Sequence, residues 1–240
     1  MTEDLRALLT DLVIASRVLA HEEVLDGFGH VSVRHPHDPQ RYFLPRSRSP
    51  ELVTIDDLIE FRLDGEPVAP TTRGMFVERA IHGAIYEQRP DVHAICHNHA
   101  ESVIPFSVTG EPLRPLMHIA ALIGERVPVW DIADSFGDDT DLLVRNLEHG
   151  RSLARTLGNG RVALMRGHGS VVAAASLPDV AITSIYLHHN ASMQLAASRL
   201  GPIRFLGPGE VARAAAAHEN PNIVGRAWEY WRARAGFSGI

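Results

Sequence analysis

The sequence of 240 residues predicts a protein of the α/β class, and two observations support this assignment. Short apolar runs that end in polar residues or glycine, as buried strands do, recur along the chain. Longer segments between them carry apolar residues at the spacing of amphipathic helices. Hydrophobic residues make up 45% of the chain and charged residues 22%, an ordinary globular composition. We therefore expect one domain over residues 1–240, with residues 201–240 as a linker and helical extension.

The expected strands follow from alternating apolar and polar residues, or from short apolar runs between turn residues. Val31 and Val33, for example, alternate with Ser32 and Arg34 after a glycine turn. Asp64-Gly65 is a preferred turn pair, so the segments on its two sides predict a hairpin. The strands expected in this way are residues 31–34, 41–44, 59–63, 66–68, 92–97, 126–130, 161–165 and 170–175.

Helices are expected where apolar residues recur every three or four positions. Leu5, Leu8 and Leu12 begin such a series, and acidic residues precede it, as helix N-termini favour. Gly158 and Pro178 mark the end of one helix and the start of the next. The expected helices are residues 5–20, 73–89, 142–157, 178–200, 210–219 and 222–235, with short helical segments from residues 54 and 102.

Two histidines stand at the end of the strand expected at residues 92–97. Side chains alternate along a strand, so His97 and His99 point the same way and could bind one metal ion together. The alternative is a pair of hydrogen-bonded surface histidines. Cys96 points to the opposite face, where we expect it to pack in the core rather than to act as a nucleophile.

Two further residues could complete such a metal site. Glu78 lies in the early part of the helix before this strand, one turn ahead of His82 on the same face. His168 lies between two glycines after a buried strand, where the backbone can turn sharply. Taken alone, His168 would be an ordinary turn histidine, but a third imidazole and a carboxylate together favour a metal site.

The order of these elements resembles the class II aldolase/adducin family. A helix with Glu78 comes first, followed by a strand that ends in His97 and His99. His168 follows much later, and the likeness covers about residues 5–200. The resemblance implies a three-layer α/β/α sandwich around a largely antiparallel sheet, usually assembled as a homotetramer with active sites at subunit interfaces. It also implies that the three histidines hold a divalent metal, Zn²⁺ or Mn²⁺, and that the glutamate is the acid/base.

The chain departs from the family's aldolases at the positions that would bind a sugar phosphate. Gly29-His30 stands in place of a Gly-Asn turn, and residues 45–48 replace a Thr-containing glycine turn. Phe76-Val77 stands where serines would precede the glutamate. Small residues with free N–H donors suit a phosphate, and these replacements do not offer them. The substrate-binding residues that the sequence offers instead are His30, Arg46, Arg48, Arg73, Phe76 and His118.

Three phrases of the sequence resemble the decarboxylase branch of the family. They are Gly-Phe-Gly-His-Val-Ser-Val-Arg, Arg-Ser-x-Ser-Pro and Glu-Arg-x-Ile-His-Gly-x-Ile-Tyr. The resemblance implies loss of CO2 from a hydroxylated aromatic ortho-dicarboxylate in aromatic catabolism, of the 3,4-dihydroxyphthalate or 3-hydroxy-2-methylpyridine-4,5-dicarboxylate type. Guanidinium groups fork onto carboxylates, and Phe76 would face a flat ring. The alternatives are arginines that are solvated surface charges and a phenylalanine that packs in the core.

Two other functions are compatible with this framework. The first is an aldolase or dehydratase for a sugar phosphate, which would need phosphate donors that the sequence lacks. The second is a non-catalytic, adducin-like interaction module, which loss of the metal ligands would mark. All three histidines are present, so an enzyme is favoured over a module. The choice between Zn²⁺ and Mn²⁺, and between a benzene and a pyridine ring, stays open.

Charge and composition narrow the partners. The net charge of -6 disfavours nucleic acid, and no apolar run reaches the ~18 residues of a membrane span. A single cysteine excludes an intramolecular disulfide and fits the reducing cytoplasm. The last helix holds Trp228, Tyr230 and Trp231, for which a lone domain would offer little core. Since aromatic residues are enriched at interfaces, we expect this helix to contribute to a homotetramer.

Overall fold

The computed structural model describes residues 2–237; Met1 and residues 238–240 of the expected C-terminal extension lie outside the described residues. Its centre is a sheet of seven strands in the order β3-β2-β1-β4-β7-β6-β5. Neighbouring strands are antiparallel except β5 and β6, which run parallel. The strands are β1 His30–Arg34, β2 Arg41–Pro45, β3 Leu58–Arg62, β4 Ala94–Asn98, β5 Val129–Trp130, β6 Val162–Met165 and β7 Gly169–Ala174.

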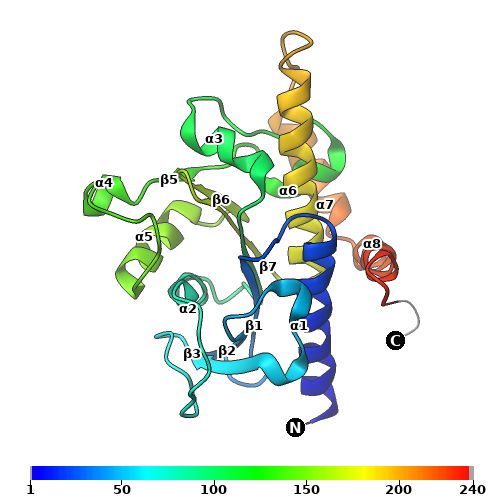
Figure 1. Ribbon diagram of the computed structural model, residues 1–240. Helices are drawn as coiled ribbons and strands as arrows, with labels where there is room; N and C mark the ends of the chain where they lie inside the picture. The colour runs from blue at the N-terminus through cyan, green and yellow to red at the C-terminus, as the bar shows by residue number, and fades with distance from the viewer. Residues whose placement is uncertain (1, 238–240) are drawn as a thin grey trace.

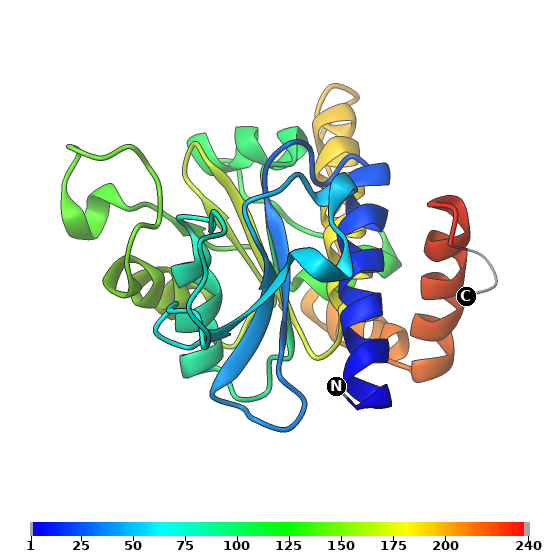
Figure 2. The same cartoon turned by 60° about the horizontal axis from the view of Figure 1, so that its bottom comes forward.

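Helices cover both faces of this sheet, so the expected three-layer α/β/α sandwich with a largely antiparallel sheet is confirmed (Figure 1). One core joins the sheet to α1, α6 and α8, and the other joins it to α2 and α5. Figure 2 shows α8 outside α1, on the side away from the sheet. The helices are α1 Glu3–His21, α2 Arg79–Gln88, α3 Ile104–Val108, α4 Ala133–Phe136, α5 Leu147–Leu157, α6 Leu177–Ala197, α7 Pro208–His218 and α8 Pro221–Arg234, with 3₁₀ turns η1 Pro50–Leu52, η2 Ile55–Asp57, η3 Glu101–Val103 and η4 His118–Ile123.

Side chains of β4 alternate between the two cores. Ala94 and Cys96 pack on the α1–α6 side, whereas Ile95 packs on the α2–α5 side. Cys96 is fully buried, as expected, and burial raises the pKa of its thiol to about 12. It is therefore a core residue, and the odd-numbered positions of β4 face the α2–α5 side, toward the site described below.

Three local predictions differ from the structure. The second half of the predicted hairpin is reduced to an isolated bridge between Phe61 and Pro67, because proline has no N–H to donate to a ladder. The helix expected from residue 73 begins at Arg79, so Glu78 is its N-cap rather than a residue in its early part. The helix expected from residue 142 begins at Leu147, after an Asn146 cap.

The last helix gives a further correction. Trp228 and Trp231 are 8% and 6% exposed and pack in the core with α1 and α6. The expectation that the protein's own domain would offer them too little core is therefore wrong, while Tyr230 remains 54% exposed. Within residues 2–237, no helix combines the length and the apolar character needed to cross a bilayer.

Candidate metal centre and substrate cleft

Four side chains meet where β4 ends, and they belong to Glu78, His97, His99 and His168. Nε2 of His99 lies 3.1 Å from Nε2 of His97 and 3.1 Å from Nε2 of His168. Oε2 of Glu78 lies 3.2 Å from Nε2 of His97 and 3.4 Å from Nε2 of His168. The fold thus gathers into one cluster the four residues that the sequence singled out for a metal and its acid/base.

Strand pairing places the histidines. Asn98 of β4 lies opposite Ser170 of β7, so the β6–β7 turn that carries His168 falls beside the end of β4. This turn is tight: Gly167 adopts a φ of 63°, and a Cβ on Gly169 would lie 2.1 Å from the carbonyl oxygen of Asn98. Both positions therefore require glycine, and the close approach they permit brings His168 against His99.

Hydrogen bonds behind two of the rings fix which nitrogen faces the cluster. Nδ1 of His97 lies 3.1 Å from the carbonyl oxygen of Ser170, and Nδ1 of His168 lies 2.9 Å from the carbonyl oxygen of Leu142. A carbonyl oxygen only accepts, so each Nδ1 carries the proton and each Nε2 turns a lone pair toward the cluster. Metal-binding histidines are commonly oriented in this way.

The cluster has the dimensions of a divalent metal site. Tetrahedral ligands at ~2.0–2.1 Å from Zn²⁺ lie about 3.3 Å from one another. Four of the six pairs among the facing nitrogen and oxygen atoms are separated by 3.1 to 3.4 Å, and all four atoms lie within 4.8 Å of one another. Lone pairs that converge this closely need a cation or a proton between them. The residues present therefore fit a metal ion, and three imidazoles with a carboxylate suit Zn²⁺ and Mn²⁺ alike.

Glu78 enters this cluster as a carboxylate. Burial acts to raise the pKa of Glu78, but the close approach of the His97 and His168 rings outweighs it, so this pKa lies well below its ordinary value. Oε1 accepts a hydrogen bond of 2.9 Å from the backbone N–H of Val144. One oxygen is thereby held while the other faces the histidines, where it could be a fourth ligand or a base beside a metal.

The non-helical segment before α5 explains why its start was mispredicted. Leu142 has a φ of 66°, which turns its carbonyl oxygen toward Nδ1 of His168. Val144, two residues later, donates its N–H to Glu78. Backbone groups that serve side chains of the site cannot also close helical turns. The apolar pattern here predicts a helix, but the hydrogen bonds to His168 and Glu78 hold this segment in a non-helical conformation.

A cleft of about 460 Å³ opens on the cluster, since both Glu78 and His99 line it. His30 and Phe76 form part of its wall, with ring centroids 4.4 Å apart. Phe28, which the sequence prediction did not include, lies at the edge, 68% exposed and with its ring centroid 6.4 Å from that of His99. Its position between two glycines, two residues before His30, is the signal that could have identified it. The volume suits a small, single-ring substrate.

Of the expected arginines Arg46 and Arg48, only Arg48 is among the residues that line the cleft. Asp57, buried in η2, ties both: Nε of Arg46 donates to Oδ1 at 2.6 Å, and Nη1 of Arg48 donates to Oδ2 at 3.0 Å. Thr54 donates to the same carboxylate from its N–H and its hydroxyl, which closes a capping box. Asp57 was not expected from the sequence, although Thr54-x-x-Asp57 is the pattern that signals such a cap.

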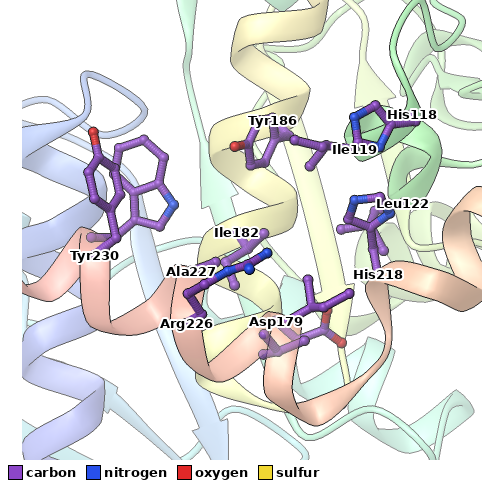
Figure 3. A pocket seen from close by; sticks show the side chains of 13 residues that line it. His118, Ile119, Leu122, Asp179, Ile182, Tyr186, His218, Arg226, Ala227 and Tyr230 are labelled. Carbon is purple, nitrogen blue, oxygen red and sulfur yellow. The ribbon is translucent and has the colours of Figure 1, made fainter.

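The two remaining residues of the predicted substrate site lie elsewhere. Arg73 is exposed, its Nη1 donates to the carbonyl oxygen of Asp56, and it is not among the residues that line the cleft. His118 begins η4 and lines a separate pocket of about 380 Å³ between η4, α6, α7 and α8. Figure 3 shows it facing His218, at 5.1 Å between ring centroids. Within the described chain, neither residue reaches the cleft.

With this fold and site in view, the comparisons with known proteins define the class. Residues 10–195 match the family described as Class II Aldolase and Adducin N-terminal domain. The chain belongs to the class II aldolase/adducin family. An aldolase II superfamily protein from Pseudomonas syringae, known as a crystal structure, superposes with a TM-score of 0.82 at 22% identity, covering 100% of this chain and 96% of that one. This likeness confirms the fold.

Curated relatives narrow the class to a lyase. The chain is 35% identical over 204 residues to Decarboxylase tropJ of Talaromyces stipitatus, covering 80% of this chain and 77% of the relative. It is 29% identical over 205 residues to a 3,4-dihydroxyphthalate decarboxylase of Arthrobacter keyseri, covering 79% of this chain and 78% of the relative. Relatives with these names support a decarboxylase within the class II aldolase family.

Proposed function

We propose that the protein is a divalent-metal-dependent decarboxylase that removes CO2 from a hydroxylated aromatic ortho-dicarboxylate. The observation that carries this proposal is the cluster of Glu78, His97, His99 and His168 at a cleft bordered by aromatic rings and an arginine. The relatives named as decarboxylases support the reaction type. Zn²⁺ or Mn²⁺ would serve as the metal, and a benzene or pyridine ring as the substrate core.

The walls of the cleft match the substrate class. Phe28 and Phe76 offer ring faces and edges against which a flat ring can pack. Arg48 offers a guanidinium that can fork onto a carboxylate, and Asp57 holds it in place. His30 adds a polar nitrogen to the same wall. These groups would bind two carboxylates on adjacent ring carbons better than a sugar phosphate.

The chain's own residues then have distinct roles. His97, His99 and His168 would hold the metal through Nε2, and the metal when bound supplies Lewis-acid chemistry that draws electrons from the bond to the departing carboxylate. Because Glu78 is ionised, it first acts as a base and accepts the proton of the substrate hydroxyl. When the C–C bond breaks, CO2 leaves and its electron pair stays on the ring carbon. Glu78 returns the proton to that carbon, so protons and charge balance.

The test measures CO2 release from 3,4-dihydroxyphthalate and from 3-hydroxy-2-methylpyridine-4,5-dicarboxylate, with L-fuculose 1-phosphate as the control for aldolase activity. We expect release from at least one diacid and no cleavage of the sugar phosphate. Elemental analysis should give about one metal per chain, and the His97→Ala, His99→Ala double variant should lose it. Cleavage of the sugar phosphate without CO2 release from either diacid would refute the proposal, as would full metal retention in the double variant.

A further inference from the structure

A buried chain of hydrogen bonds leads from the cleft into the core beneath α2. Nδ1 of His30 lies 2.7 Å from Nε2 of His82, and Nδ1 of His82 lies 2.6 Å from Oγ of Ser32. Oγ of Ser32 in turn lies 2.8 Å from the hydroxyl of Tyr86. All four residues are at most 4% exposed. Of the four, His30 alone lines the cleft, so the other three touch the site only through it.

The direction of the protons along this chain follows from its inner end. The Tyr86 hydroxyl has two acceptors within reach, Oγ of Ser32 at 2.8 Å and the carbonyl oxygen of His93 at 3.4 Å. That carbonyl already accepts the backbone N–H of Arg34 at 2.8 Å. The contact with Ser32 has the length of an ordinary O–H···O hydrogen bond, whereas the contact with His93 is longer than that range. Tyr86 therefore donates to Ser32.

Each remaining bond is then determined. Ser32 has one proton and gives it to Nδ1 of His82, so that nitrogen is bare. An imidazole with one bare nitrogen is neutral and carries its single proton on the other nitrogen. The proton of His82 is on Nε2, which donates to Nδ1 of His30. The proton of His30 is consequently on its own Nε2, on the side of the ring away from His82.

We infer that Tyr86, Ser32 and His82 are positioning residues that fix the tautomer of His30, so that His30 presents a neutral Nε2–H donor to a carboxylate of the bound aromatic acid. This inference rests on the proposed function for the identity of the ligand. Phe76, at 4.4 Å between ring centroids, supports the plane of the His30 ring. The register that pairs His30 with His97 across β1 and β4 places the donor beside the metal cluster.

A neutral donor suits this place better than a cation. The cluster of histidines and its metal already supplies positive charge, and a second cation against it would cost electrostatic energy. A neutral N–H orients a carboxylate without holding it as an ion pair. It remains a donor because the buried chain reverses only if Tyr86 turns its proton from Ser32 to the longer, 3.4 Å contact with the carbonyl oxygen of His93. Arg48 remains the one guanidinium of the predicted set on the cleft wall.

The first experiment reads the tautomer directly and needs no ligand. The full-length, Zn²⁺-loaded protein is labelled with ¹⁵N-histidine, and ¹⁵N–¹H correlation spectra distinguish protonated from bare ring nitrogens. The signal of His30 is identified by its loss in His30→Gln. We expect protonation at Nε2 and a bare Nδ1. Protonation at Nδ1 overturns the inference, whatever reaction the enzyme catalyses.

The second experiment tests the positioning role with a matched pair of hydroxyl deletions. Tyr86→Phe should weaken binding of 3,4-dihydroxybenzoate about three- to tenfold, the range of one net hydrogen bond, and should add the other His30 tautomer to the spectrum. Tyr42→Phe is the control, since Tyr42 is equally buried, lies 5.4 Å from Tyr86 between ring centroids and donates instead to Arg79. If Tyr86→Phe and Tyr42→Phe change binding and the spectrum equally, Tyr86 has only a structural role, and the inference is overturned.

The third experiment assigns the donor to the carboxylate. Calorimetry compares 3,4-dihydroxybenzoate with catechol, which lacks the carboxylate. His30→Phe should weaken binding of the acid about tenfold and leave binding of catechol within about twofold of the unaltered protein. The amide of His30→Gln can reach the position of Nε2, so this variant should recover most of the affinity for the acid that His30→Phe loses. Equal losses for both compounds overturn the inference. If His30 is protonated at Nε2 and shows this selectivity for the acid, but no CO2 is released from either diacid, the proposed function is wrong. The inference that His30 donates to a carboxylate is then still supported.

Discussion

A substitution at Glu78 can test the acid/base role separately from metal binding. Glu78→Gln keeps the shape of the side chain and its acceptor for Val144 but removes the proton carrier. We expect the fold to be retained and turnover to fall roughly 100- to 10,000-fold, the usual contribution of an acid/base group. Kinetics and metal content of the variant would be measured together, with the exposed Glu66→Gln as control. Wild-type turnover would move the role to another group.

Arg48 is the arginine that should grip a substrate carboxylate, because it alone of the three predicted arginines lines the cleft. Arg48→Ala should raise KM and weaken binding by about 1.5–3 kcal/mol, the range of a hydrogen bond to a charged group. Arg46→Ala should act more weakly, through the loosened Asp57 that both arginines share. Arg73→Ala should change little. If kcat/KM is the same in all three variants, the carboxylate is held elsewhere.

Asp57 should make stability depend on acid pH. Burial acts to raise the pKa of this carboxyl, but donors from Thr54, Arg46 and Arg48 outweigh it, so the pKa lies well below its ordinary value of 3.8. A depressed pKa stabilises the fold above about pH 4, and this stabilisation is lost as the pH falls further toward the folded value. Asp57→Asn should therefore lower the free energy of unfolding near pH 7 and flatten its acid dependence. Urea unfolding near pH 7 and again below about pH 4 measures the free energy of unfolding of each variant. The exposed Asp64→Asn variant is the control.

At the scale of elements, the packing of α5 on α2 depends on a glycine. A Cβ on Gly150 would lie 2.6 Å from the carbonyl oxygen of Ala80 and 2.9 Å from Cβ of Ala84, so the two helices would have to separate. Gly150→Ala should destabilise the protein by about 1–3 kcal/mol, as overpacking does. Gly225→Ala in α8, where a Cβ meets nothing within 4 Å, should instead stabilise it by roughly 0.5–1 kcal/mol. Thermal unfolding of the two variants measures these effects. Equal changes in Tm would show that α2 and α5 can move apart without loss of stability.

Elements with an uninterrupted pattern were predictable, and those that serve the site were not. The first helix and the strand ending in His97 follow from periodicity because their own packing determines their structure. The start of α5 does not, since Leu142 and Val144 give backbone groups to His168 and Glu78. That exchange depends on partners far away in the sequence, which a local pattern cannot contain.

The same distinction holds for the site as a whole. Histidines at strand ends and a helix glutamate are visible in sequence because their chemical types are few and their spacing is regular. Phe28, Asp57 and His82 act through neighbours that only the folded sheet brings together, so a local pattern such as a glycine pair or a capping box marks a position without revealing its role in the site. Conversely, His118 carries a suggestive side chain, but the fold places it in another pocket.

The whole molecule is predicted to be a homotetramer. The two tryptophans of α8 no longer argue for it, but Tyr230 remains exposed on the same helix, and its ring lines the pocket between η4, α6, α7 and α8. Light scattering at micromolar concentration should give four times the chain mass, and Tyr230→Asp should reduce it if this surface is an interface. A fully active monomer of the unaltered protein would contradict the prediction.

The position of β7 in the sheet has a consequence for synthesis on the ribosome. β7 lies between β4 and β6, yet its Ser170 meets Asn98 across 72 residues of sequence. While those residues are being translated, the nascent chain exposes an unpaired strand edge with apolar side chains, a surface prone to association with other chains. During the same interval His97 and His99 have emerged but His168 has not. Translation pauses in this stretch would therefore leave a chain that is prone to association and that lacks one of the three histidines of the proposed metal site, so chaperone protection is needed most there.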